Sequence, residues 1–594
     1  MEKWFVSSKK ADFEGWSREL GIDVVTARIL RNRDIETLEE ARAFLGGTLN
    51  DMHSPFLMKD MEKAAIFTLD AIRANKKIRV IGDYDVDGVT SAYILTKGLK
   101  CLGAEVSTAI PHRIHDGYGL SEDLVRDAHI DGINLIITCD NGISAGPQID
   151  IGNSLGIDVI VTDHHEVPFT EDEKGNREQI LPNAVAVVDP KRYDCEYPFE
   201  GICGAMVALK LMQATLSILE EKEDEKAKDL RLSMDELISF AVVGTVCDVM
   251  ELKDENRILV REGLKKIGKT QNEGLKALFE VNKIDPSKAS VYHLGFVIGP
   301  CINASGRLDT ALRAFELLNE GNKAKALTIA TELKELNDSR KNLTNDGIEE
   351  AVSYIEAHGL NEKSVWLIYL PDVHESIAGI IAGRIREKYN HPVFVFTKGE
   401  EMVKGSGRSI EGYHMQENLV AASHLLSKFG GHAMAAGLSL EEEKLAMLDD
   451  FLNENARLGE EDFISKVHID VPMPLDYASM RLAKEIEKLA PFGTGNPNPL
   501  FAQKDLSFMS MSRFGSEGKY ARYKVRTETG KYYEITSFLS PDDFLTTLEE
   551  KYGSGSAESF ESGLAQYKMS ITYQLDINSF RGEEKLQFML KNYC

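Results

Sequence analysis

Short apolar runs alternate with stretches of helical periodicity between residues 77 and 190. The apolar runs are Ile78–Ile81, Val106–Ile110, Ile133–Thr138, Val159–Thr162 and Ala184–Val188. Runs of this length, separated by helices and bounded by turn residues, are typical of buried strands in a parallel sheet. We therefore predict an α/β fold whose first large domain is a doubly wound, mostly parallel sheet.

The pattern changes several times along the rest of the chain. The first residues look helical and polar, whereas residues 310–360 are rich in Ala, Leu, Glu and Lys and lack proline, which predicts long connecting helices. A second alternating region follows, and the segment Ala490–Pro499 combines proline with glycine as a linker does. Short alternating strands with turn clusters then predict a small β-barrel. The predicted boundaries are 1–60 for an N-terminal helical segment, 61–309 for the doubly wound domain, 310–360 for the connecting helices, 361–460 for a second α/β domain, 461–499 for a linker and 500–594 for the barrel.

Composition limits the class of protein. The chain has 594 residues, 43% hydrophobic and 28% charged, which is ordinary usage for several globular domains. The net charge of −26 argues against a protein that coats duplex DNA, but it leaves room for a local basic groove and suits divalent cations. The seven cysteines are scattered without a C-x-x-C pair, so we expect reduced thiols in a cytoplasmic protein. The first residues lack an apolar segment and no apolar run could span a bilayer, so we expect neither a secretory signal nor membrane contact.

The first candidate for chemistry is an acidic loop with the sequence Gly82-Asp-Tyr-Asp-Val-Asp-Gly88. A calcium-binding EF-hand begins similarly, but its twelfth position would be Ile94 where a bidentate Glu is required. A plain surface turn is also a poor explanation, because the loop connects the carboxyl end of a buried strand to the start of a helix. Ligand sites of doubly wound sheets lie there, and clustered carboxylates need a cation to offset their repulsion.

Two further strand ends carry polar side chains of the same kind. Asp140 follows the run Ile133–Thr138, and Asp163-His164-His165 follows the run Val159–Thr162. The carboxyl ends of parallel strands meet at one edge of the sheet, so these groups should lie beside the acidic loop. Oxygen and imidazole ligands favour Mn²⁺ or Mg²⁺ over zinc, and several carboxylates together suggest two ions roughly 3.5–4 Å apart. We predict hydrolysis of a phosphoester, with Asp140 shared between two ions.

A fourth acid should complete this group. Asp248 directly follows the long apolar run Leu237–Val246, where a charge is costly unless it is paired or binds a metal. A helix-end cap is the alternative explanation, and Glu251 and Asp254 are nearby competitors. Position alone does not decide between these possibilities.

Together these motifs resemble the DHH phosphoesterase superfamily, which is named after the sequence Asp163-His164-His165, and within it the RecJ family of single-stranded-DNA-specific exonucleases. The resemblance covers nearly the whole chain. It identifies residues 61–309 as a DHH catalytic domain, 361–460 as a DHHA1 domain and 500–594 as an OB-like domain. It implies the metal ligands Asp85, Asp87, Asp140, His164 and Asp248, and catalytic roles for Asp140, His164, His165 and His432.

The resemblance also extends to segments that would hold the substrate. Glycines in Lys404-Gly-Ser-Gly-Arg408 and Gly430-Gly-His432 let backbone amides approach phosphates, and Arg408 offers a bidentate fork. His432 would hold a phosphate or protonate the leaving oxygen, unless it is only a core histidine in a tight turn. The family usually has Arg where this chain has Cys301, which would weaken one phosphate contact. The implied substrate-binding residues are Arg113, in a segment that continues to Gly117-Tyr-Gly119, and Asn303, Arg307, Ser406, Arg408 and His432.

Basic and aromatic residues alternate in the C-terminal region, with Arg522, Tyr523 and Lys524 as the candidate nucleic-acid contacts. Such interleaving fits base stacking combined with phosphate neutralisation. An ordinary amphipathic hairpin would show the same pattern.

The resemblance implies a metal-dependent exonuclease that degrades single-stranded DNA 5′ to 3′ to mononucleotides, with two Mn²⁺ or Mg²⁺ ions, in DNA repair and recombination. It implies a cytoplasmic monomer with a single-strand-binding protein and a RecQ-type helicase as partners. The alternative is a phosphodiesterase of short oligoribonucleotides or cyclic dinucleotides, but such small substrates need no C-terminal strand-binding module. A non-catalytic scaffold would have lost ligands, and all five are present.

Overall fold

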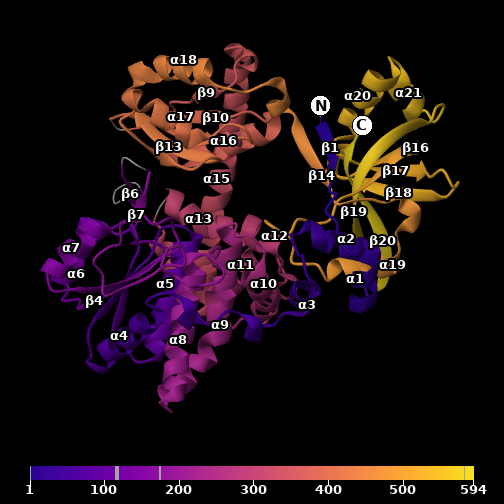
Figure 1. Ribbon diagram of the computed structural model, residues 1–594. Coiled ribbons are helices and arrows are strands. Elements are labelled where there is room, and N and C mark those ends of the chain that lie inside the picture. Colours follow the sequence, from indigo (N-terminus) through magenta and orange to yellow (C-terminus); the bar gives the residue numbers. More distant parts are fainter. Residues whose placement is uncertain (1, 114–118, 173–174, 309, 400, 581) are drawn as a thin grey trace. The chain divides into compact units, whose positions relative to one another are not determined.

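The computed structural model describes residues 2–113, 119–172, 175–308, 310–399, 401–580 and 582–594 (Figure 1). Gly117 and Tyr118, part of one predicted segment, lie outside these residues. The chain forms two compact units, which are described separately. The first unit contains Met52–Met250 and Leu259–Ser465, and the second contains Glu2–Asp51, Glu251–Ile258 and Lys466–Cys594.

A five-stranded parallel sheet forms the base of the first unit. Its order is β3 (Val106–Ala109), β2 (Ile78–Ile81), β4 (Leu135–Cys139), β5 (Asp158–Thr162) and β8 (Ala186–Val188). Helices α6 (Glu122–Ile130) and α7 (Gly146–Ser154) cover one face, and α5 (Val86–Cys101) and α8 (Gly204–Glu221) cover the other (Figure 1). The predicted doubly wound fold is confirmed. The strand order reverses between β2 and β4, which is where ligands bind in such sheets.

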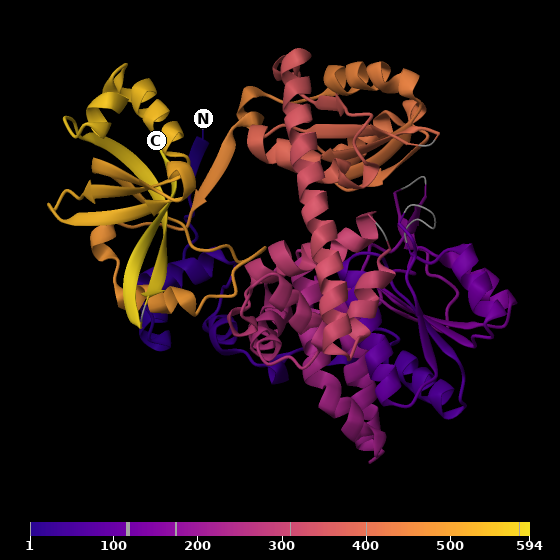
Figure 2. The same cartoon turned by 180° about the vertical axis from the view of Figure 1, so that it is seen from behind.

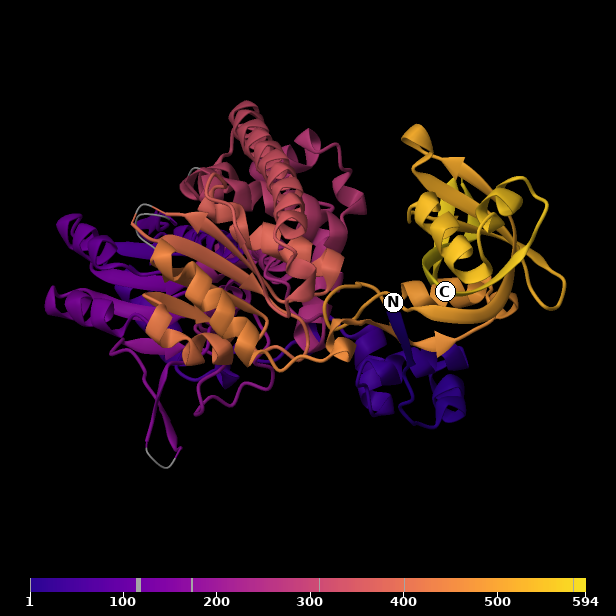
Figure 3. The same ribbon diagram turned by 90° about the horizontal axis from the view of Figure 1, so that it is seen from above.

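Several further helices complete this part of the unit. They are α4 (Met61–Arg73), α9 (Lys226–Cys247), α10 (Asp254–Ile267), which continues from the second unit, α11 (Glu273–Val281), α12 (Val291–His293), the π-helical turn η4 (Leu294–Ile298) and α13 (Gly299–Leu308). A hairpin of β6 (Phe169–Glu171) and β7 (Arg177–Gln179) projects from the connection between β5 and β8 (Figure 3).

Two helices connect this sheet to a second one in the same unit. They are α14 (Leu312–Asn319) and α15 (Lys323–Ala357), a continuous helix of 35 residues that is prominent in Figure 2. The second sheet has the order β12 (Lys428–Gly431), β13 (Ala435–Leu440), β11 (Val403–Arg408), β10 (Val393–Lys398) and β9 (Trp366–Tyr369). Helix α16 (Glu375–Tyr389) packs on one face, and α17 (Met415–Ala421) and α18 (Leu445–Asn455) pack on the other. This confirms a second α/β domain.

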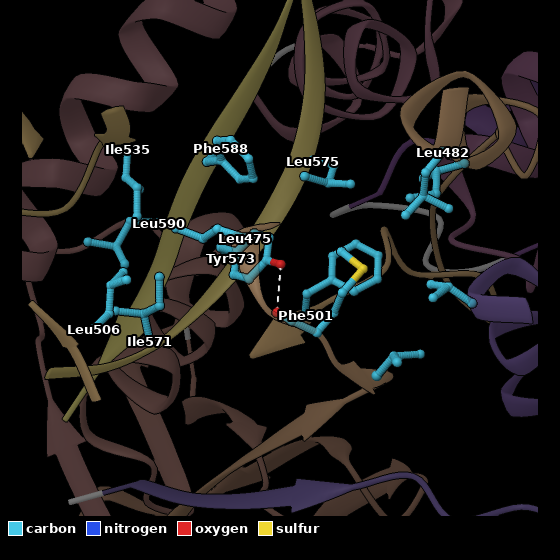
Figure 4. Close-up of a cluster of buried hydrophobic side chains, with 14 of the residues drawn as sticks. Leu475, Leu482, Phe501, Leu506, Ile535, Ile571, Tyr573, Leu575, Phe588 and Leu590 are labelled. Atoms are coloured by element: carbon cyan, nitrogen blue, oxygen red, sulfur yellow. Dashed lines mark hydrogen bonds between the residues drawn. The ribbon is translucent and has the colours of Figure 1, made fainter. Parts of the chain in front are cut away.

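The second unit contains the C-terminal β-barrel. Its strands are β15 (Val471–Pro472), β16 (Phe501–Phe514), β17 (Tyr520–Arg526), β18 (Tyr532–Ser537), β20 (Glu583–Tyr593) and β19 (Tyr567–Phe580), and pairing of β16 with β19 closes the sheet. Buried side chains such as Phe501, Tyr573 and Phe588 fill the interior (Figure 4). The OB-like barrel is confirmed. Helices α20 (Pro541–Tyr552) and α21 (Ser556–Glu561) interrupt it, whereas the sequence pattern predicts only strands and turns there.

Two other expectations for this unit need correction. The expected linker 461–499 contains β14 (Ser465–Ile469), which pairs with β1 (Glu2–Val6), then β15 and α19 (Met480–Glu487). Leu482 of α19 is buried in the barrel core, so this segment is part of the folded unit. The N-terminal helices α1 (Phe13–Leu20), α2 (Val24–Asn32) and α3 (Leu38–Gly46) pack in the same core through Trp16 and Ile29. The glycines and prolines of residues 461–499 suggest a linker and draw attention away from the apolar positions of that segment. The contacts of the N-terminal helices with the barrel core join residues that are distant in sequence, so local patterns do not predict them.

No helix among the described residues is long and apolar enough to cross a membrane.

Candidate metal centre

The acidic loop joins the carboxyl end of β2 to the first turn of α5. Asp85 caps the helix, with its Oδ1 accepting a hydrogen bond from the Gly88 N–H at 3.0 Å. Asp83 and Asp87 are buried on either side, and Asp83 Oδ1 accepts from the Gly119 N–H at 3.3 Å. A Cβ at position 88 would lie 2.4 Å from the Asp83 nitrogen, so only glycine fits this close approach. The loop therefore fixes three carboxylates within five residues.

Three carboxylates from three elements surround the His164 imidazole. Its Nε2 lies 3.0 Å from Asp140 Oδ1, 3.6 Å from Asp87 Oδ2 and 3.8 Å from Asp248 Oδ2. Asp140 follows β4 in the left-handed region, with φ of 61°, and Asp248 is the C-cap residue directly after α9. The strand ends and the helix end that the sequence suggested are therefore brought together.

The amino terminus of α8 supports this group from one side. Asp87 Oδ2 accepts a hydrogen bond from the Gly204 N–H at 2.6 Å, and Asp87 Oδ1 accepts from the Ala205 N–H at 2.9 Å. Unpaired N–H groups at a helix amino terminus carry partial positive charge and stabilise a carboxylate. A Cβ at Gly204 would lie 2.6 Å from the Asp140 Cβ, so the glycine lets α8 reach the centre.

Asp163 positions the histidine pair. Its Oδ1 accepts from the His164 N–H at 2.8 Å and lies 2.8 Å from His165 Nδ1, and its Oδ2 accepts from the Ile143 N–H at 2.9 Å. Burial lowers the pKa of His165, but the hydrogen bond to Asp163 and the negative charges of Asp163, Asp248 and Asp87 together outweigh burial and raise that pKa to about 9. His165 is therefore charged at neutral pH, and Asp163 sets its orientation.

The electrostatics of the acids favour a bound cation. Burial, followed by repulsion from Asp85, raises the pKa of Asp83 to about 8. Burial, followed by repulsion from Asp87 and Asp85, raises the pKa of Asp248 to about 8. Asp140 is raised well above its usual range for the same reasons. Positive charge placed among these groups would restore their ionised forms, since burial and repulsion between like charges together hold the protons.

The donor set fits hard divalent ions. Potential ligand atoms lie within 4.8 Å of one another in three groups, namely Asp140 with His164 and His165, Asp87 with His164 and Asp248, and Asp83 with Asp85 and Asp140. Asp248 Oδ2 is buried and has no hydrogen-bond partner among the described residues, as expected for an atom that faces a ligand. Oxygen and imidazole donors suit Mn²⁺ or Mg²⁺. Asp140 belongs to two groups, which supports the prediction that it is shared between ions.

A cavity of about 280 Å³ lies between the two sheets of this unit. Tyr84 and Arg113 line it on one side, and Ser376, Ser406 and Gly437 line it on the other. The Arg113 guanidinium lies 4.7 Å from the centre of the Tyr84 ring. Two of the predicted substrate-binding residues, Arg113 and Ser406, therefore face one space.

Two other predicted substrate-binding residues make structural contacts. Asn303 Oδ1 accepts from the Val86 N–H at 3.1 Å, so this side chain supports the start of α5. Arg307 Nη1 donates to the Ser376 carbonyl at 2.6 Å. Burial, followed by the like charge of Arg113, lowers the pKa of Arg307 to about 10. A nearby anion would stabilise a buried cation that lies beside another cation, and this supports a phosphate contact for Arg307. The contact itself stays a prediction.

Arg408 and His432 lie on the same sheet but differ in environment. Arg408 Nη1 donates to the Gly407 carbonyl at 2.7 Å, and burial lowers the pKa of its guanidinium. His432 is exposed in the turn between β12 and β13, where its N–H donates to the Ala435 carbonyl at 2.8 Å. The alternative of a core histidine is therefore wrong, whereas the catalytic role stays a prediction.

One of the three candidate contacts on the barrel is wrong. Tyr523 is only 1% exposed, and its ring packs against Phe508 and Phe544 in the barrel core. Arg522 and Lys524 are exposed on the opposite face of β17, because successive side chains of a strand alternate between faces. Both remain candidate contacts with nucleic acid.

The sequence reasoning missed a buried acid at the same sheet edge. Asp189 follows β8, is fully buried, and its Oδ2 has no hydrogen-bond partner among the described residues. Burial, followed by repulsion from Asp163, raises its pKa to about 8. The rule that selected Asp140, a carboxylate directly after an apolar run, applies equally to Asp189 and could have found it.

We expect Asp248→Asn to stabilise the metal-free protein, and to do so more at pH 8 than at pH 5. The folded-state pKa of Asp248 is about 8, against a usual value of 3.8. The folded state therefore binds more protons than the unfolded state between these pH values, so this carboxyl lowers wild-type stability as pH rises through that range. The difference between variant and wild type should grow by an amount on the order of a few kcal/mol. Urea denaturation in a chelator at both pH values measures it, and a difference that does not change with pH would contradict it.

Family models match the chain in three places. The DHH family N-terminal domain matches residues 77–245, the DHHA1 domain matches residues 362–457, and the RecJ OB domain matches residues 469–592. These matches follow the order of the two α/β sheets and the barrel along the chain.

Named relatives resemble the chain over nearly its whole length. The single-stranded-DNA-specific exonuclease RecJ of Bacillus subtilis is 32% identical over 99% of this chain and 70% of its own length. The enzyme of the same name from Escherichia coli is 32% identical over 95% of both chains. The crystal structure of RecJ from Thermus thermophilus in complex with Mn²⁺ has a TM-score of 0.80 and 26% identity, and covers 100% of this chain and 79% of that chain. Identity above 30% along at least 95% of the sequence shows that the chain belongs to the RecJ family of DHH phosphoesterases.

Proposed function

We propose that the chain is a metal-dependent exonuclease that degrades single-stranded DNA 5′ to 3′ to mononucleotides, in DNA repair and recombination. The observation that carries the proposal is the acid and histidine cluster at the switch point of the parallel sheet, in the same unit as a cavity lined from both sheets. Relatives that are named single-stranded-DNA-specific exonucleases support the substrate class.

The proposed ions are two Mn²⁺ or Mg²⁺ ions, and a relative crystallised in complex with Mn²⁺ supports this choice. When bound, two such ions would activate water and stabilise charge on the attacking and leaving oxygens. The proposed ligands are Asp85, Asp87, Asp140, His164 and Asp248.

The side chains of the chain itself hold and orient the substrate. Arg113 and Ser406 face the same cavity, and we assign them to the terminal phosphate of the strand. Asp163 holds the proton on His165 Nδ1, so His165 faces the substrate as a cation. Gly437 leaves open space above the sheet, because no atom lies within 4 Å of where its Cβ would be, and a sugar-phosphate backbone can approach there. In this assignment residues 61–309 contain the metal centre. Residues 361–460 form the side of the cavity that limits the length of the product.

We further propose that the protein acts as a cytoplasmic monomer, and that a single-strand-binding protein and a RecQ-type helicase are its partners. Enzymes of single-stranded DNA metabolism need a supply of unpaired strand, which is what such partners provide.

A degradation assay with Mn²⁺ tests the proposed function. The substrates are a long single strand labelled at either end, the matching blunt duplex, a dinucleotide and a cyclic dinucleotide. We expect mononucleotides from the long single strand, beginning at its 5′ end, and much slower cleavage of the duplex. Cleavage of the short substrates alone would favour a phosphodiesterase of oligoribonucleotides or cyclic dinucleotides instead.

The barrel provides a second arm of the same assay. Arg522 lies over the Phe514 ring at 5.1 Å and Lys524 lies over the Tyr532 ring at 5.1 Å, so two cations stand beside aromatic faces on one exposed surface. The double variant R522A/K524A should raise KM for the long strand roughly tenfold and leave dinucleotide cleavage unchanged. Lys585, which is 78% exposed on the same barrel, supplies the control variant K585A. Equal losses on both substrates would argue against a strand-binding role for this surface.

A further inference from the structure

A second cavity, of about 820 Å³, lies within the second α/β domain, and no step of the proposed function uses it. We name it the lysine cavity, because its lining includes Lys398 at the end of β10, Lys404 on β11 and Lys428 on β12. It shares Glu375, Lys404 and Ser439 with the smaller cavity of about 280 Å³. That smaller cavity, to which we assign the terminal phosphate of the strand, is named the phosphate cavity. The two cavities therefore meet at a common wall.

The register of the sheet explains how the two cavities adjoin. Ser406 of β11 pairs with Gly437 of β13, and both residues line the phosphate cavity. Two residues further along these strands, Lys404 pairs with Ser439, which pairs in turn with Lys428 of β12. Residues two apart on a strand point to the same face and lie about 7 Å from each other. One row of the sheet therefore lines the phosphate cavity, and the next row on the same face lines the lysine cavity.

Positive charge exceeds negative charge around the lysine cavity, although the whole chain has a net charge of −26. The lining contains three lysines and two acids, Glu375 and Glu401. Lys404 Nζ lies 2.7 Å from Glu375 Oε2, so these two charges compensate each other. Lys398 and Lys428 are exposed and form no ion pair with any residue that the structure describes. Like charges that line one cavity repel each other, so an anion placed between them is favoured.

The shape and the lining of this space suit phosphate groups better than a nucleotide base. No atom lies within 4 Å of where a Cβ of Gly430 or Gly437 would be, so the face of the sheet is open beside the lysine row. The described lining residues of the lysine cavity include no phenylalanine, tyrosine or tryptophan. Bases in single-strand sites usually stack on such rings, whereas lysine binds phosphate as a point charge.

We propose that the lysine cavity holds the additional phosphates of a strand whose 5′ end is a diphosphate or a triphosphate. The proposal rests on the proposed function, which places the phosphate attached to the first sugar in the phosphate cavity. The second and third phosphates extend from there past Lys404 and Ser439 and reach Lys398 and Lys428. Each ammonium group compensates charge that a 5′ monophosphate does not carry. The substrates of the proposed exonuclease therefore include strands with 5′ polyphosphate ends.

Hydrolysis at such an end follows the same course as at a monophosphate end. Water attacks the phosphorus atom that joins the first and second nucleotides. The bond from that phosphorus to the 3′ oxygen of the first nucleotide breaks, and this oxygen takes up a proton. The first product is then a nucleoside 5′-triphosphate with a free 3′ hydroxyl, and the shortened strand keeps a 5′ monophosphate. The triphosphate itself stays intact, because none of the residues that line the lysine cavity is a proposed metal ligand.

Single strands of one sequence with a 5′ monophosphate, diphosphate or triphosphate test the proposal. For wild type, we expect KM for release of the first nucleotide to be roughly tenfold lower for the triphosphate strand than for the monophosphate strand. Chromatography should identify the first product as a nucleoside triphosphate. The double variant K398A/K428A should lose the difference in KM and keep the wild-type KM for the monophosphate strand. A wild-type KM that is equal or higher for the triphosphate strand would overturn the proposal, and so would release of pyrophosphate.

Salt dependence separates phosphate binding from a structural role of the two lysines. Each additional contact between a cation and a phosphate makes binding fall more steeply with salt. The triphosphate strand should therefore show the steeper dependence of KM on salt in wild type, and the two strands should show equal dependence in K398A/K428A. The conservative variant K398R/K428R should keep the preference for the triphosphate strand. Lys388, exposed on α16 of the same domain, supplies the matched variant K388A, which should behave as wild type.

The same experiment distinguishes failure of this proposal from failure of the proposed function. A wild type that degrades none of the three strands rejects the proposed function. A wild type that degrades the monophosphate strand but gains nothing from the additional phosphates rejects the role of the lysine cavity alone. An equal rise in KM for all three strands in K398A/K428A would also reject that role, because the lysines would then act on the strand as a whole.

Discussion

Replacing Asp140 with asparagine should lower turnover on single-stranded DNA by about 10³-fold or more while changing strand affinity only severalfold. Asp140 belongs to two of the three groups of potential ligand atoms and lies 3.0 Å from His164 Nε2. An amide has the same shape but lacks the negative charge that would hold two cations together. Metal ions supply several kcal/mol of transition-state stabilisation in such hydrolyses, which corresponds to a loss of this size.

Asparagine is the appropriate replacement because Asp140 has a φ of 61°, a conformation that asparagine tolerates and alanine does not. Asp189→Asn is the matched control, since Asp189 is a buried acid at the same sheet edge but belongs to none of the three groups formed by the described residues. We expect it to lose less than about tenfold. Turnover rates, with Mn²⁺ affinity by calorimetry, distinguish the two variants. Unchanged Mn²⁺ affinity in Asp140→Asn would refute the shared-ligand assignment.

The parallel sheet and most of the acid cluster could be predicted because their signals are local. A charged residue close after a buried apolar run is costly unless something binds it. Asp140 directly follows β4, and the loops that directly follow β2 and β5 carry Asp85 and His164. The strand order did not need to be known, since all parallel strands end at one edge. Asp248 needed the resemblance, because a helix-end cap produces the same local pattern.

The remaining features depend on contacts that local patterns do not contain. Whether Tyr523 or Arg522 faces solvent depends on which face of β17 the barrel encloses, and a shift of one residue exchanges the two. Asn303 supports the start of α5 through a contact over 217 residues of sequence. The N-terminal helices fill the core of the C-terminal unit, so removing residues 500–594 would expose Trp16 and its neighbours. Point variants on the barrel surface are therefore a cleaner test of strand binding than a truncation.

The acidic loop gives the second large prediction, Gly88→Ala, through its backbone. Helix propensity alone predicts that alanine at this position of α5 stabilises the protein by about 1 kcal/mol. The structure predicts the opposite, because the new Cβ would lie 2.4 Å from the Asp83 nitrogen and 2.5 Å from the Asp83 oxygen. Backbone atoms cannot rotate away as a side chain can, so the loop must open and displace Asp83 and Asp85. We expect activity to fall by about 10²-fold or more, since small misplacements of catalytic groups have effects of that size.

Gly146→Ala is the matched control for this clash. Gly146 begins α7 in the same domain, has no atom within 4 Å of where its Cβ would be, and does not have positive φ. Alanine there should leave activity unchanged and stability unchanged or slightly raised. Thermal denaturation and Mn²⁺ titration of both variants separate a general loss of folding from a loss confined to the loop. If Gly88→Ala binds Mn²⁺ with the affinity of wild type, the close approach of α5 to Asp83 does not set the geometry of the metal centre. The backbone N–H groups at the start of α8, which Gly204 brings close, would then position the carboxylates instead.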